Sequence, residues 1–476
     1  MAGKPGKKGN KVSRSSAASA PPEKKDSYDP VRAACVEVLR QVLDRGHKSD
    51  AIIAGILAKN KFSDLDRRFL LQLCHGVIKM KRRLDYIYRF YLERPADRID
   101  PITRQILRLG LYQLIFTDRI PAGAAVSEAV NLARGMVHHS RGSFVNAILR
   151  NFLRRPEKVV FPDRDENPVE YLGLFYSYPE WFVKYCIDEF AEERTEELLK
   201  RGNRAPTLTY RINPLLISHQ RLQEKLAREK ITYHQGKYLP DFYHIEKSGL
   251  PLQSELLTNG RVYVQDEAAG MAVHLLNPRP RDHVIDLASA PGGKATYLGI
   301  LMKNQGMITA VDINQQRLEI LVENARRMGI QIIAPVLCDI MDFRGPTCDF
   351  VLLDTLCSGW GVLAKNSDLR WSKSREDSTK LARMQSKLIW HAADLVNPGG
   401  VLVYSTCTIL REENDQIIEE FLLENKNFKI DSAANYFPAE LVNERGFLKT
   451  YPNIEGLDGH FCVRLKKKVG PRSKKS

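Results

Sequence analysis

Two cysteines occupy positions where a nucleophile could act on a bound ligand. Cys357 lies in the sequence Asp-Thr-Leu-Cys-Ser-Gly and Cys407 in Tyr-Ser-Thr-Cys-Thr, each after an apolar stretch that predicts a buried β-strand. Ligands of α/β sheets bind outside the carboxyl ends of the strands. A thiolate there is a strong nucleophile. The pair suits a reaction in which one thiolate adds to a pyrimidine ring and a second group helps to release it, as cytosine methylation requires.

Carbon 5 of cytosine is a poor nucleophile until a thiolate adds to carbon 6, after which the ring behaves as an enamine and accepts a methyl group. Asp354, three residues before Cys357, could hydrogen-bond ring nitrogen 3 as charge develops there. The residues alone leave open which cysteine attacks. The alternative, that both cysteines only pack at strand ends, is disfavoured by the residues around them.

A glycine-containing loop follows the predicted strand at residues 284–287 and precedes a predicted helix. Its residues are Ala288, Ser289, Ala290, Pro291, Gly292, Gly293 and Lys294. The glycine pair lets a ligand approach the backbone, with a helix N-terminus behind it. The loop is not a P-loop, because Ala288 and Ala295 replace the required Gly and Ser/Thr, and the dinucleotide motif G-x-G-x-x-G is absent.

Carboxylates end three successive predicted strands, at Asp312, Asp339 and Asp354. Asp312 lies where sheets of this type hold ribose hydroxyls. A single strand-end Asp is more often a helix cap, but three in series beside a glycine turn favour a ligand. Together they predict S-adenosylmethionine as cofactor, since its ribose and adenine suit carboxylates and it carries no phosphate.

The elements that must position these residues divide the chain into segments. Residues 29–155 repeat apolar positions at intervals of three and four and predict an all-helical domain. Residues 156–260 predict a small α+β module, and residues 261–466 alternate short apolar strands with helices, which predicts an α/β domain with a mostly parallel sheet. The predicted strands of that sheet are 284–287, 307–311, 332–337, 350–353 and 400–404.

Composition limits the class of protein. The 476 residues predict about two to four domains, and 43% hydrophobic with 27% charged residues is typical of a soluble globular protein. No apolar run could span a bilayer and the N-terminus lacks a secretion signal, so we expect a cytoplasmic protein with no membrane association. Eight cysteines without a Cys-x-x-Cys motif or a His/Cys cluster argue against a disulfide framework and a metal site. Cys35, Cys74 and Cys186 are expected to be buried core residues.

The net charge of +15 is concentrated at the two ends of the chain. Residues 1–25 hold seven Lys or Arg and one Glu, and residues 466–476 hold six Lys or Arg and no acid. We expect residues 1–28 and 467–476 to be disordered basic tails that either tether phosphates or only keep the protein soluble. A basic helix end is a second candidate for phosphate contact, with solvated surface as the alternative; its residues are Arg141, Arg150, Arg154 and Arg155.

The loop at 288–294, the Cys357 and Cys407 motifs and the sequence Asp-Gly-His-Phe at 458–461 resemble the bacterial Sun/Fmu (RsmB-type) RNA cytosine-5 methyltransferases of the NOL1/NOP2/Sun family. The helical region, most clearly at 124–130 and 144–150, resembles the NusB-type RNA-binding domain fused in this group. The resemblance implies methylation of a cytosine in small-subunit (16S) rRNA in a bacterial cytoplasm. It further implies that Cys407 is the nucleophile, that Cys357 releases the product, and that 288–294, Asp312, Asp339 and Asp354 line the S-adenosylmethionine site.

The chain departs from this family beside Cys357. The family usually has Asp-Ala-Pro-Cys-Ser-Gly, whereas Leu356 stands here in place of the proline, and Trp360 follows where a small residue is common. Loss of the proline predicts a less rigid backbone and slower release. Two other functions stay open: a tRNA cytosine-5 methyltransferase, which uses the same base chemistry, and a catalytically idle RNA-binding or ribosome assembly factor.

Overall fold

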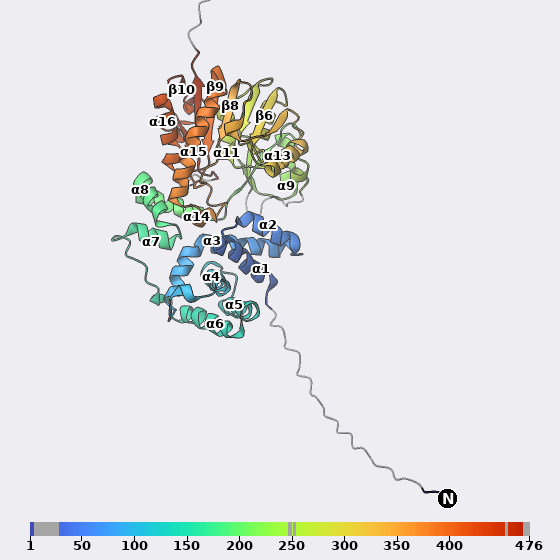
Figure 1. The fold of residues 1–476 in the computed structure, drawn as a ribbon, viewed down its shortest axis with the longest axis vertical. Helices are drawn as coiled ribbons and strands as arrows, with labels where there is room; N and C mark the ends of the chain where they lie inside the picture. Colours follow the sequence, from blue (N-terminus) through green and yellow to red (C-terminus); the bar gives the residue numbers. More distant parts are fainter. Residues whose placement is uncertain (4–27, 246–249, 251–253, 453–455, 470–476) are drawn as a thin grey trace, which may run out of the picture.

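A computed structural model describes residues 1–3, 28–245, 250, 254–452 and 456–469 of the protein. Most of the two predicted basic tails lies outside the described residues. Figure 1 shows a helical domain below, an α/β domain above, and smaller elements between and beside them. This arrangement confirms the predicted multidomain fold class.

The N-terminal domain is built from six helices. They are α1 (Pro30–Leu39), extended by a π-helical turn at Arg40–Asp44, α2 (Ser49–Lys59), α3 (Asp64–Arg89), α4 (Pro101–Phe116), α5 (Ala122–Met136) and α6 (His139–Arg154). Polar caps fix their starts: Asp100 accepts the N–H of Thr103 ahead of Pro101, and Ser63 forms a capping box with Asp66. Cys35 and Cys74 are buried in the core between α1 and α3, as expected.

Two further helices lead from this domain into a small antiparallel sheet. They are α7 (Pro168–Phe175) and α8 (Glu180–Asn203), the latter interrupted at Ala191, whose φ is 62°. The module contains β1 (Leu208–Ile212), α9 (His219–Arg228), β2 (Tyr233–Gln235), β3 (Phe242–Ile245), α10 (Glu255–Thr258) and β4 (Val262–Val264). Its strand order is β2-β3-β1-β4. The alternating sequence at 207–214 predicts β1, whereas the three other strands were not predicted.

The α/β domain carries an eight-stranded sheet in which β10-β12-β9-β8-β5-β6-β7 are neighbours and β11 pairs with β12. Its elements are α11 (Glu267–Leu276), β5 (His283–Leu287), α12 (Gly293–Leu301), β6 (Met307–Asp312), α13 (Gln315–Arg327), β7 (Ile333–Leu337), β8 (Cys348–Asp354), α14 (Leu369–Ser372), α15 (Arg375–Asp394), β9 (Val396–Thr406), α16 (Asp415–Glu424), β10 (Phe428–Ile430), β11 (Leu448–Thr450) and β12 (His460–Lys467). The five predicted strands are present and parallel, and the last three add antiparallel pairs.

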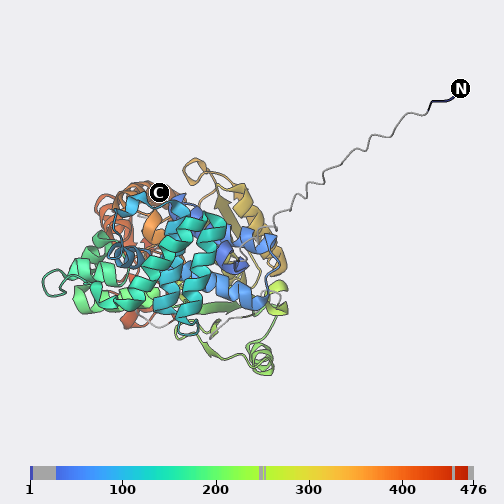
Figure 2. The same ribbon diagram turned by 90° about the horizontal axis from the view of Figure 1, so that it is seen from below.

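A short segment after the Cys357 loop joins the helical and α/β domains. Arg370 is fully buried and donates to the Gly202 carbonyl and the Asn203 side chain at the end of α8 (2.8 and 2.6 Å). Trp371 Nε1 donates to the carbonyl of Ile78 on α3 (2.6 Å). Figure 2, seen from below, shows the helical domain lying across the end of the α/β domain. These contacts therefore attach the N-terminal domain to the segment that follows the Cys357 loop.

Candidate active site

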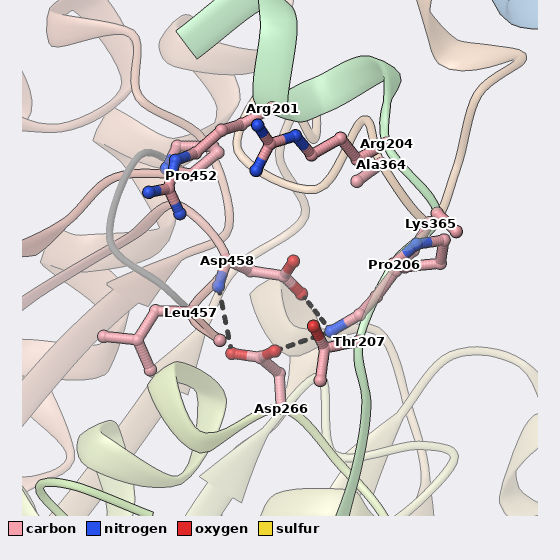
Figure 3. Close-up of a pocket in the computed structure, with 12 residues that line it drawn as sticks. Arg201, Arg204, Pro206, Thr207, Asp266, Ala364, Lys365, Pro452, Leu457 and Asp458 are labelled. Atoms are coloured by element: carbon pink, nitrogen blue, oxygen red, sulfur yellow. Dashed lines mark hydrogen bonds and ion pairs between the residues drawn. The ribbon is translucent and has the colours of Figure 1, made fainter. Parts of the chain in front are cut away.

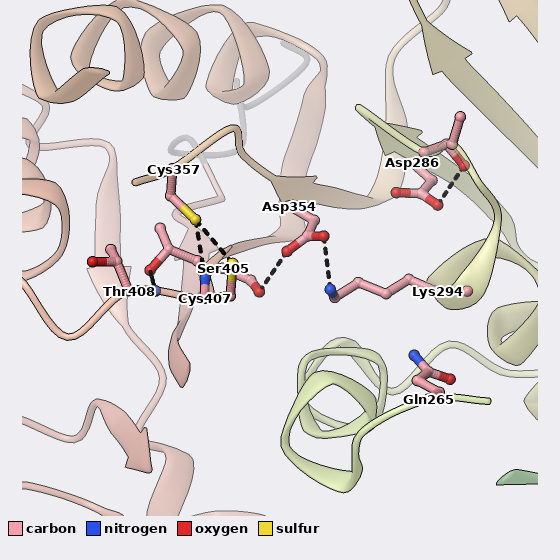
Figure 4. A network of polar contacts seen from close by, with 12 residues as sticks. Gln265, Asp286, Lys294, Asp354, Cys357, Ser405, Cys407 and Thr408 are labelled. Atoms are coloured by element: carbon pink, nitrogen blue, oxygen red, sulfur yellow. Dashed lines mark hydrogen bonds and ion pairs between the residues drawn. The ribbon is translucent and has the colours of Figure 1, made fainter. Parts of the chain in front are cut away.

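The structure brings the two sequence-predicted cysteines together. Cys407 directly follows β9 and Cys357 lies three residues after β8, and these two strands are parallel neighbours. Their Sγ atoms are 3.1 Å apart, and the N–H of Cys407 donates to the Cys357 sulfur (3.3 Å). Figure 4 shows both sulfurs beside Asp354 and Lys294. The pair can therefore act on one bound group.

The environment of the two sulfurs makes them unequal. The hydrogen bond with Cys407, together with burial, raises the pKa of the Cys357 thiol well above its ordinary value. Cys357 therefore keeps its proton, and its sulfur also accepts the N–H of Cys407. In the contact between the two sulfurs either atom can be the donor.

The Cys407 loop is held by hydrogen bonds within its own segment. Thr406 donates to the Asn414 side chain (2.6 Å), and the Asn414 amide donates to the Thr408 carbonyl (2.8 Å). The buried Tyr404 hydroxyl donates to the Glu413 carbonyl (2.7 Å). Residues 404–414 thus fold back on themselves and fix where the Cys407 sulfur points.

The Cys357 loop is held by residues that sequence analysis did not select. The buried Glu413 carboxylate accepts the N–H of Ser358 (2.9 Å) and the side-chain amide of Gln385 (3.0 Å). The same amide donates to the Leu356 carbonyl (2.7 Å), although the Leu356 side chain is 55% exposed. Two buried polar side chains therefore fix the backbone where the proline is absent.

Trp360, the other departure from the family pattern, is a packing residue. It is 1% exposed, stacks on Phe182 with ring centroids 4.2 Å apart, and meets the edge of Trp181 at 4.7 Å. Both partners lie on α8. The large side chain thus anchors the Cys357 loop to the helix that leads into the small module.

An ion pair lies between the two cysteines and the glycine-containing loop at 288–294. Lys294 Nζ lies 2.7 Å from Asp354 Oδ2, and the Ser405 hydroxyl donates to the other carboxylate oxygen (2.9 Å). Burial alone would lower the pKa of Lys294, but attraction to Asp354 and their hydrogen bond raise it overall. Lys294 is therefore positively charged, and it lies between the two cysteines and the glycine-containing loop.

Two cavities adjoin at this ion pair. One has a volume of about 370 Å³, and its lining includes Cys407, Thr355, Asn366 and His460. The other, of about 220 Å³, is lined by the glycine-containing loop. Both cavities share Val264, Gln265, Ala269, Lys294 and Asp354 as lining residues. A base beside Cys407 and a cofactor on the loop would therefore meet at Lys294 and Asp354.

Most of the predicted cofactor residues line the second cavity, namely Ala288, Ser289, Ala290, Pro291, Gly293, Lys294 and Asp354. Gly292 does not line it, but its φ of 97° favours glycine, and a Cβ added there would lie only 2.9 Å from Cγ of Leu321. The loop is held from the module, since Arg211 on β1 donates to the Gly293 carbonyl (2.6 Å).

Asp312 and Asp339 do not line this cavity. Asp312 lies behind the loop and accepts the N–H groups of Ala290 and Asn314 (3.0 and 2.9 Å). Asp339 is exposed and accepts the N–H of Met341 (2.8 Å), which caps a short 3₁₀ helix at Ile340–Asp342. Their predicted contacts with the cofactor stay predictions; in the structure Asp312 holds the backbone of the loop and Asp339 caps a 3₁₀ helix.

Asp286, which sequence analysis missed, lines the cofactor cavity at the end of β5. Its Oδ2 accepts from the Ser289 hydroxyl (2.7 Å), whereas its buried Oδ1 has no partner among the described residues. Burial raises the pKa of Asp286 to about 7. A free carboxylate oxygen beside the loop fits the ammonium group of S-adenosylmethionine. Asp286 could have been predicted from its position near the end of a strand that precedes the two glycines.

The family described as 16S rRNA methyltransferase RsmB/F matches residues 273–466. The NusB family matches residues 29–154, and a ferredoxin-like domain of RsmF/B-like methyltransferases matches 178–250. The chain is 33% identical to the probable ribosomal RNA small subunit methyltransferase B of Bacillus subtilis, over 92% of this chain and 99% of that protein. The corresponding protein of Synechocystis is 34% identical, over 90% and 98%.

The chain belongs to the RsmB/F methyltransferase family. The resemblance predicted from the sequence is thereby confirmed, as are S-adenosylmethionine as cofactor and RNA as the class of substrate. A member of this family is an S-adenosylmethionine-dependent rRNA methyltransferase. The helical region is its NusB domain and the small module its ferredoxin-like domain.

Solved structures share this fold. The crystal structure of PH0851 matches with a TM-score of 0.77 at 26% identity, covering 93% of this chain and all of that one. NSun6 from Pyrococcus horikoshii, solved with SFG, matches with a TM-score of 0.55 at 22% identity over 62% of this chain and 99% of that one. The second likeness concerns the fold alone.

Within the described part of the chain, no helix combines the length and apolar character needed to cross a membrane. Among the same residues, no group of three or more His, Cys, Asp or Glu side chains is placed to hold a metal ion.

Proposed function

We propose that this RsmB/F-family protein methylates carbon 5 of a cytosine in small-subunit (16S) rRNA through a covalent adduct with Cys407, and that Cys357 releases the product. One observation carries the proposal: Cys407, whose sulfur lies 3.1 Å from that of Cys357, lines a cavity that adjoins the cofactor cavity at Lys294 and Asp354. A methyltransferase acting elsewhere on the base would not need this sulfur pair.

The first step is addition of the Cys407 thiolate to carbon 6 of a cytosine flipped out of the RNA. The thiol of Cys357 donates to the attacking sulfur, and the raised pKa of Cys357 keeps that donor protonated. A new bond joins sulfur to carbon 6, and electron density moves toward carbon 5 and ring nitrogen 3.

Lys294 stabilises this electron density at the junction of the cavities, and its ion pair with Asp354 holds the ammonium group there. The lysine is charged, and the aspartate is oriented by Lys294 and Ser405. Preorganised groups of this kind lower the barrier because they need no rearrangement when charge develops. When bound at the loop, S-adenosylmethionine would supply an electrophilic methyl group to carbon 5, with S-adenosylhomocysteine as the leaving group.

Release requires loss of the carbon 5 proton and of the sulfur. Cys357 accepts that proton as its own thiol proton passes to the departing Cys407 sulfur. The carbon 5 to carbon 6 double bond re-forms, the carbon to sulfur bond breaks, and both cysteines end as thiols. The contact of 3.1 Å between the sulfurs supports this exchange.

The predicted phosphate-binding arginines lie on the NusB domain, away from this site in Figure 1. Arg150, Arg154 and Arg155 are exposed on or beside α6, whereas Arg141 is 3.3 Å from Asp100. We keep them as candidates for contact with a distant part of the rRNA. Replacing all three exposed arginines with Ala should weaken RNA affinity most at low salt, and unchanged affinity would rule the contact out.

The test is transfer of labelled methyl from S-adenosylmethionine to protein-free small-subunit rRNA, run beside a tRNA pool and the Cys407→Ala variant. The expected result is 5-methylcytidine in the rRNA alone and none with the variant. Label in tRNA alone would favour the tRNA alternative. Full activity of Cys407→Ala would refute the covalent mechanism, and no label with either RNA would favour an idle assembly factor.

A further inference from the structure

A third cavity opens beside the one that contains Cys407. Its volume is about 130 Å³, several times the room that one water needs. It shares Thr207, Asp266, Lys365 and Asp458 with the Cys407 cavity as lining residues. A nucleotide whose base occupies the Cys407 cavity would therefore place part of its backbone or its neighbour in this space.

The two walls of this cavity differ in charge. In Figure 3 Arg201 and Arg204 lie on one side, and Lys365 lies opposite between two carboxylates. Lys365 Nζ is 2.6 Å from Asp266 and 2.7 Å from Asp458, so these acids already have a cation. Burial and the neighbouring Asp266 raise the pKa of Asp458 to about 7, which further reduces the negative charge.

Few acidic side chains pair with the two arginines in the described part of the chain. Arg201 makes a single ion pair, 3.4 Å from Glu197 on the same helix, and Arg204 makes none within the described part of the chain. Arg204 is exposed and Arg201 half-buried. Their guanidinium groups are therefore available to an anion that enters the cavity.

The turn that carries the arginines is rigid. Arg370 fixes the Gly202 carbonyl and the Asn203 side chain, and Lys79 Nζ on α3 donates to the Arg204 carbonyl (2.7 Å). Lys79 is 5% exposed and Arg370 fully buried, so neither competes for the anion. The NusB domain and the methyltransferase domain thus hold the Arg201 and Arg204 backbone together, and ordering cost on binding is reduced.

We propose that Arg201 and Arg204 bind a backbone phosphate of the RNA beside the flipped nucleotide. The inference rests on the proposed function, because it places the target base next to Cys407. A guanidinium matches a phosphate through paired, charge-assisted N–H donors. Phosphate contacts fix register without reading sequence, so this site holds the strand at a set distance from the two cysteines.

The first test compares Arg201→Gln/Arg204→Gln with wild type for binding of small-subunit rRNA over a range of salt. We expect affinity to fall roughly tenfold or more, and the log–log salt slope to become shallower by about 0.7 for each phosphate that the variant no longer neutralises. Affinity for S-adenosylmethionine should not change. Arg204→Lys keeps the positive charge but loses the planar, paired N–H donors of the guanidinium group. Its RNA affinity should lie between those of wild type and the double variant.

Arg326→Gln is the matched control, because Arg326 is exposed on α13 and lines neither of these cavities. Its salt slope should equal that of wild type. A double variant with wild-type RNA affinity and slope would overturn the proposal, and so would an equal loss in Arg326→Gln. If S-adenosylmethionine affinity fell in parallel, a folding defect and not a phosphate contact would be responsible.

A second test locates the phosphate. In an oligonucleotide around the cytosine that wild type methylates, a neutral methylphosphonate replaces the phosphate on either side of that nucleotide. One replacement should weaken binding to wild type but have little further effect on the double variant. Additive losses would place the phosphate elsewhere. Since binding is scored without turnover, failure of wild type to form 5-methylcytidine would refute the reaction separately.

Discussion

The two cysteine loops end neighbouring strands of one sheet, yet the chain holds them in different ways. The Cys407 loop is fixed by hydrogen bonds among residues 404–414. The Cys357 loop is fixed from a distance, by Gln385 on α15, by Glu413 and by the packing of Trp360 on α8. The loop of the proposed nucleophile is thus held largely by its own segment, with the Cys407 N–H and carbonyl also bonded to the Cys357 loop, whereas the loop of the releasing group is held by tertiary contacts. A local motif can therefore change beside Cys357 without loss of its geometry.

The largest expected effect that separates the loops comes from Cys357→Ala. Attack by Cys407 should persist while release fails, so turnover should fall by roughly 10²–10⁴-fold and a protein–RNA adduct should accumulate. Denaturing gel electrophoresis with labelled rRNA measures the adduct, and Cys407→Ala, which should form none, is the control. Normal turnover by Cys357→Ala would show that the two loops do not divide the reaction in this way.

Trp360→Ala removes the packing anchor of the Cys357 loop. Loss of a fully buried Trp should lower the free energy of unfolding by about 3–5 kcal/mol, measured by denaturant titration. Trp360→Phe, which keeps an aromatic ring against Phe182, is the control and should lose less. A cost below about 1 kcal/mol for the Ala variant would mean that this side chain does not anchor the loop.

Glu413→Ala tests the polar half of the same anchoring. It leaves the Ser358 N–H and the Gln385 amide without their shared acceptor, at a cost of about 1–3 kcal/mol. Because Ser358 is next to Cys357, the adduct should persist longer while its rate of formation changes little. Single-turnover kinetics separate the two rates. Slower adduct formation with normal release would contradict the assignment of Glu413 to the Cys357 loop.

Glu413→Gln keeps the shape of the side chain and adds a pH test. Burial raises the pKa of Glu413 above its ordinary 4.5, so the folded state holds this proton more tightly than the unfolded state. The associated stability is present below pH 4.5 and is lost as the pH rises through the folded-state pKa. Relative to wild type, the Gln variant should therefore gain unfolding free energy as the pH rises, and a pH-independent difference would contradict this.

The same contrast explains what the sequence could predict. The five parallel strands of the α/β sheet contain apolar runs, and the Cys407 motif and the glycine-containing loop are contiguous, so each could be predicted. Strands β2–β4 have three or four residues each and offer too short a pattern. Glu413 and Gln385 reach the Cys357 loop only through tertiary folding, and no local pattern marks them. Asp339 shows the ambiguity of a strand-end carboxylate, because that position also suits the helix cap seen in the structure, and its contact with the cofactor stays a prediction.

The smallest effect is expected from Leu356→Pro, which restores the residue usual in the family. The Leu356 N–H makes no hydrogen bond within the described residues, so proline would remove none, and the Leu356 carbonyl would still accept from Gln385. We expect unfolding free energy to change by less than about 1 kcal/mol, through the entropy of the unfolded chain, and adduct release to change less than about threefold. Measured in Glu413→Ala, however, the same substitution should speed release, because proline rigidity would then replace the missing hydrogen bonds. A large gain in the wild-type background would instead mean that Gln385 and Glu413 do not substitute for the proline.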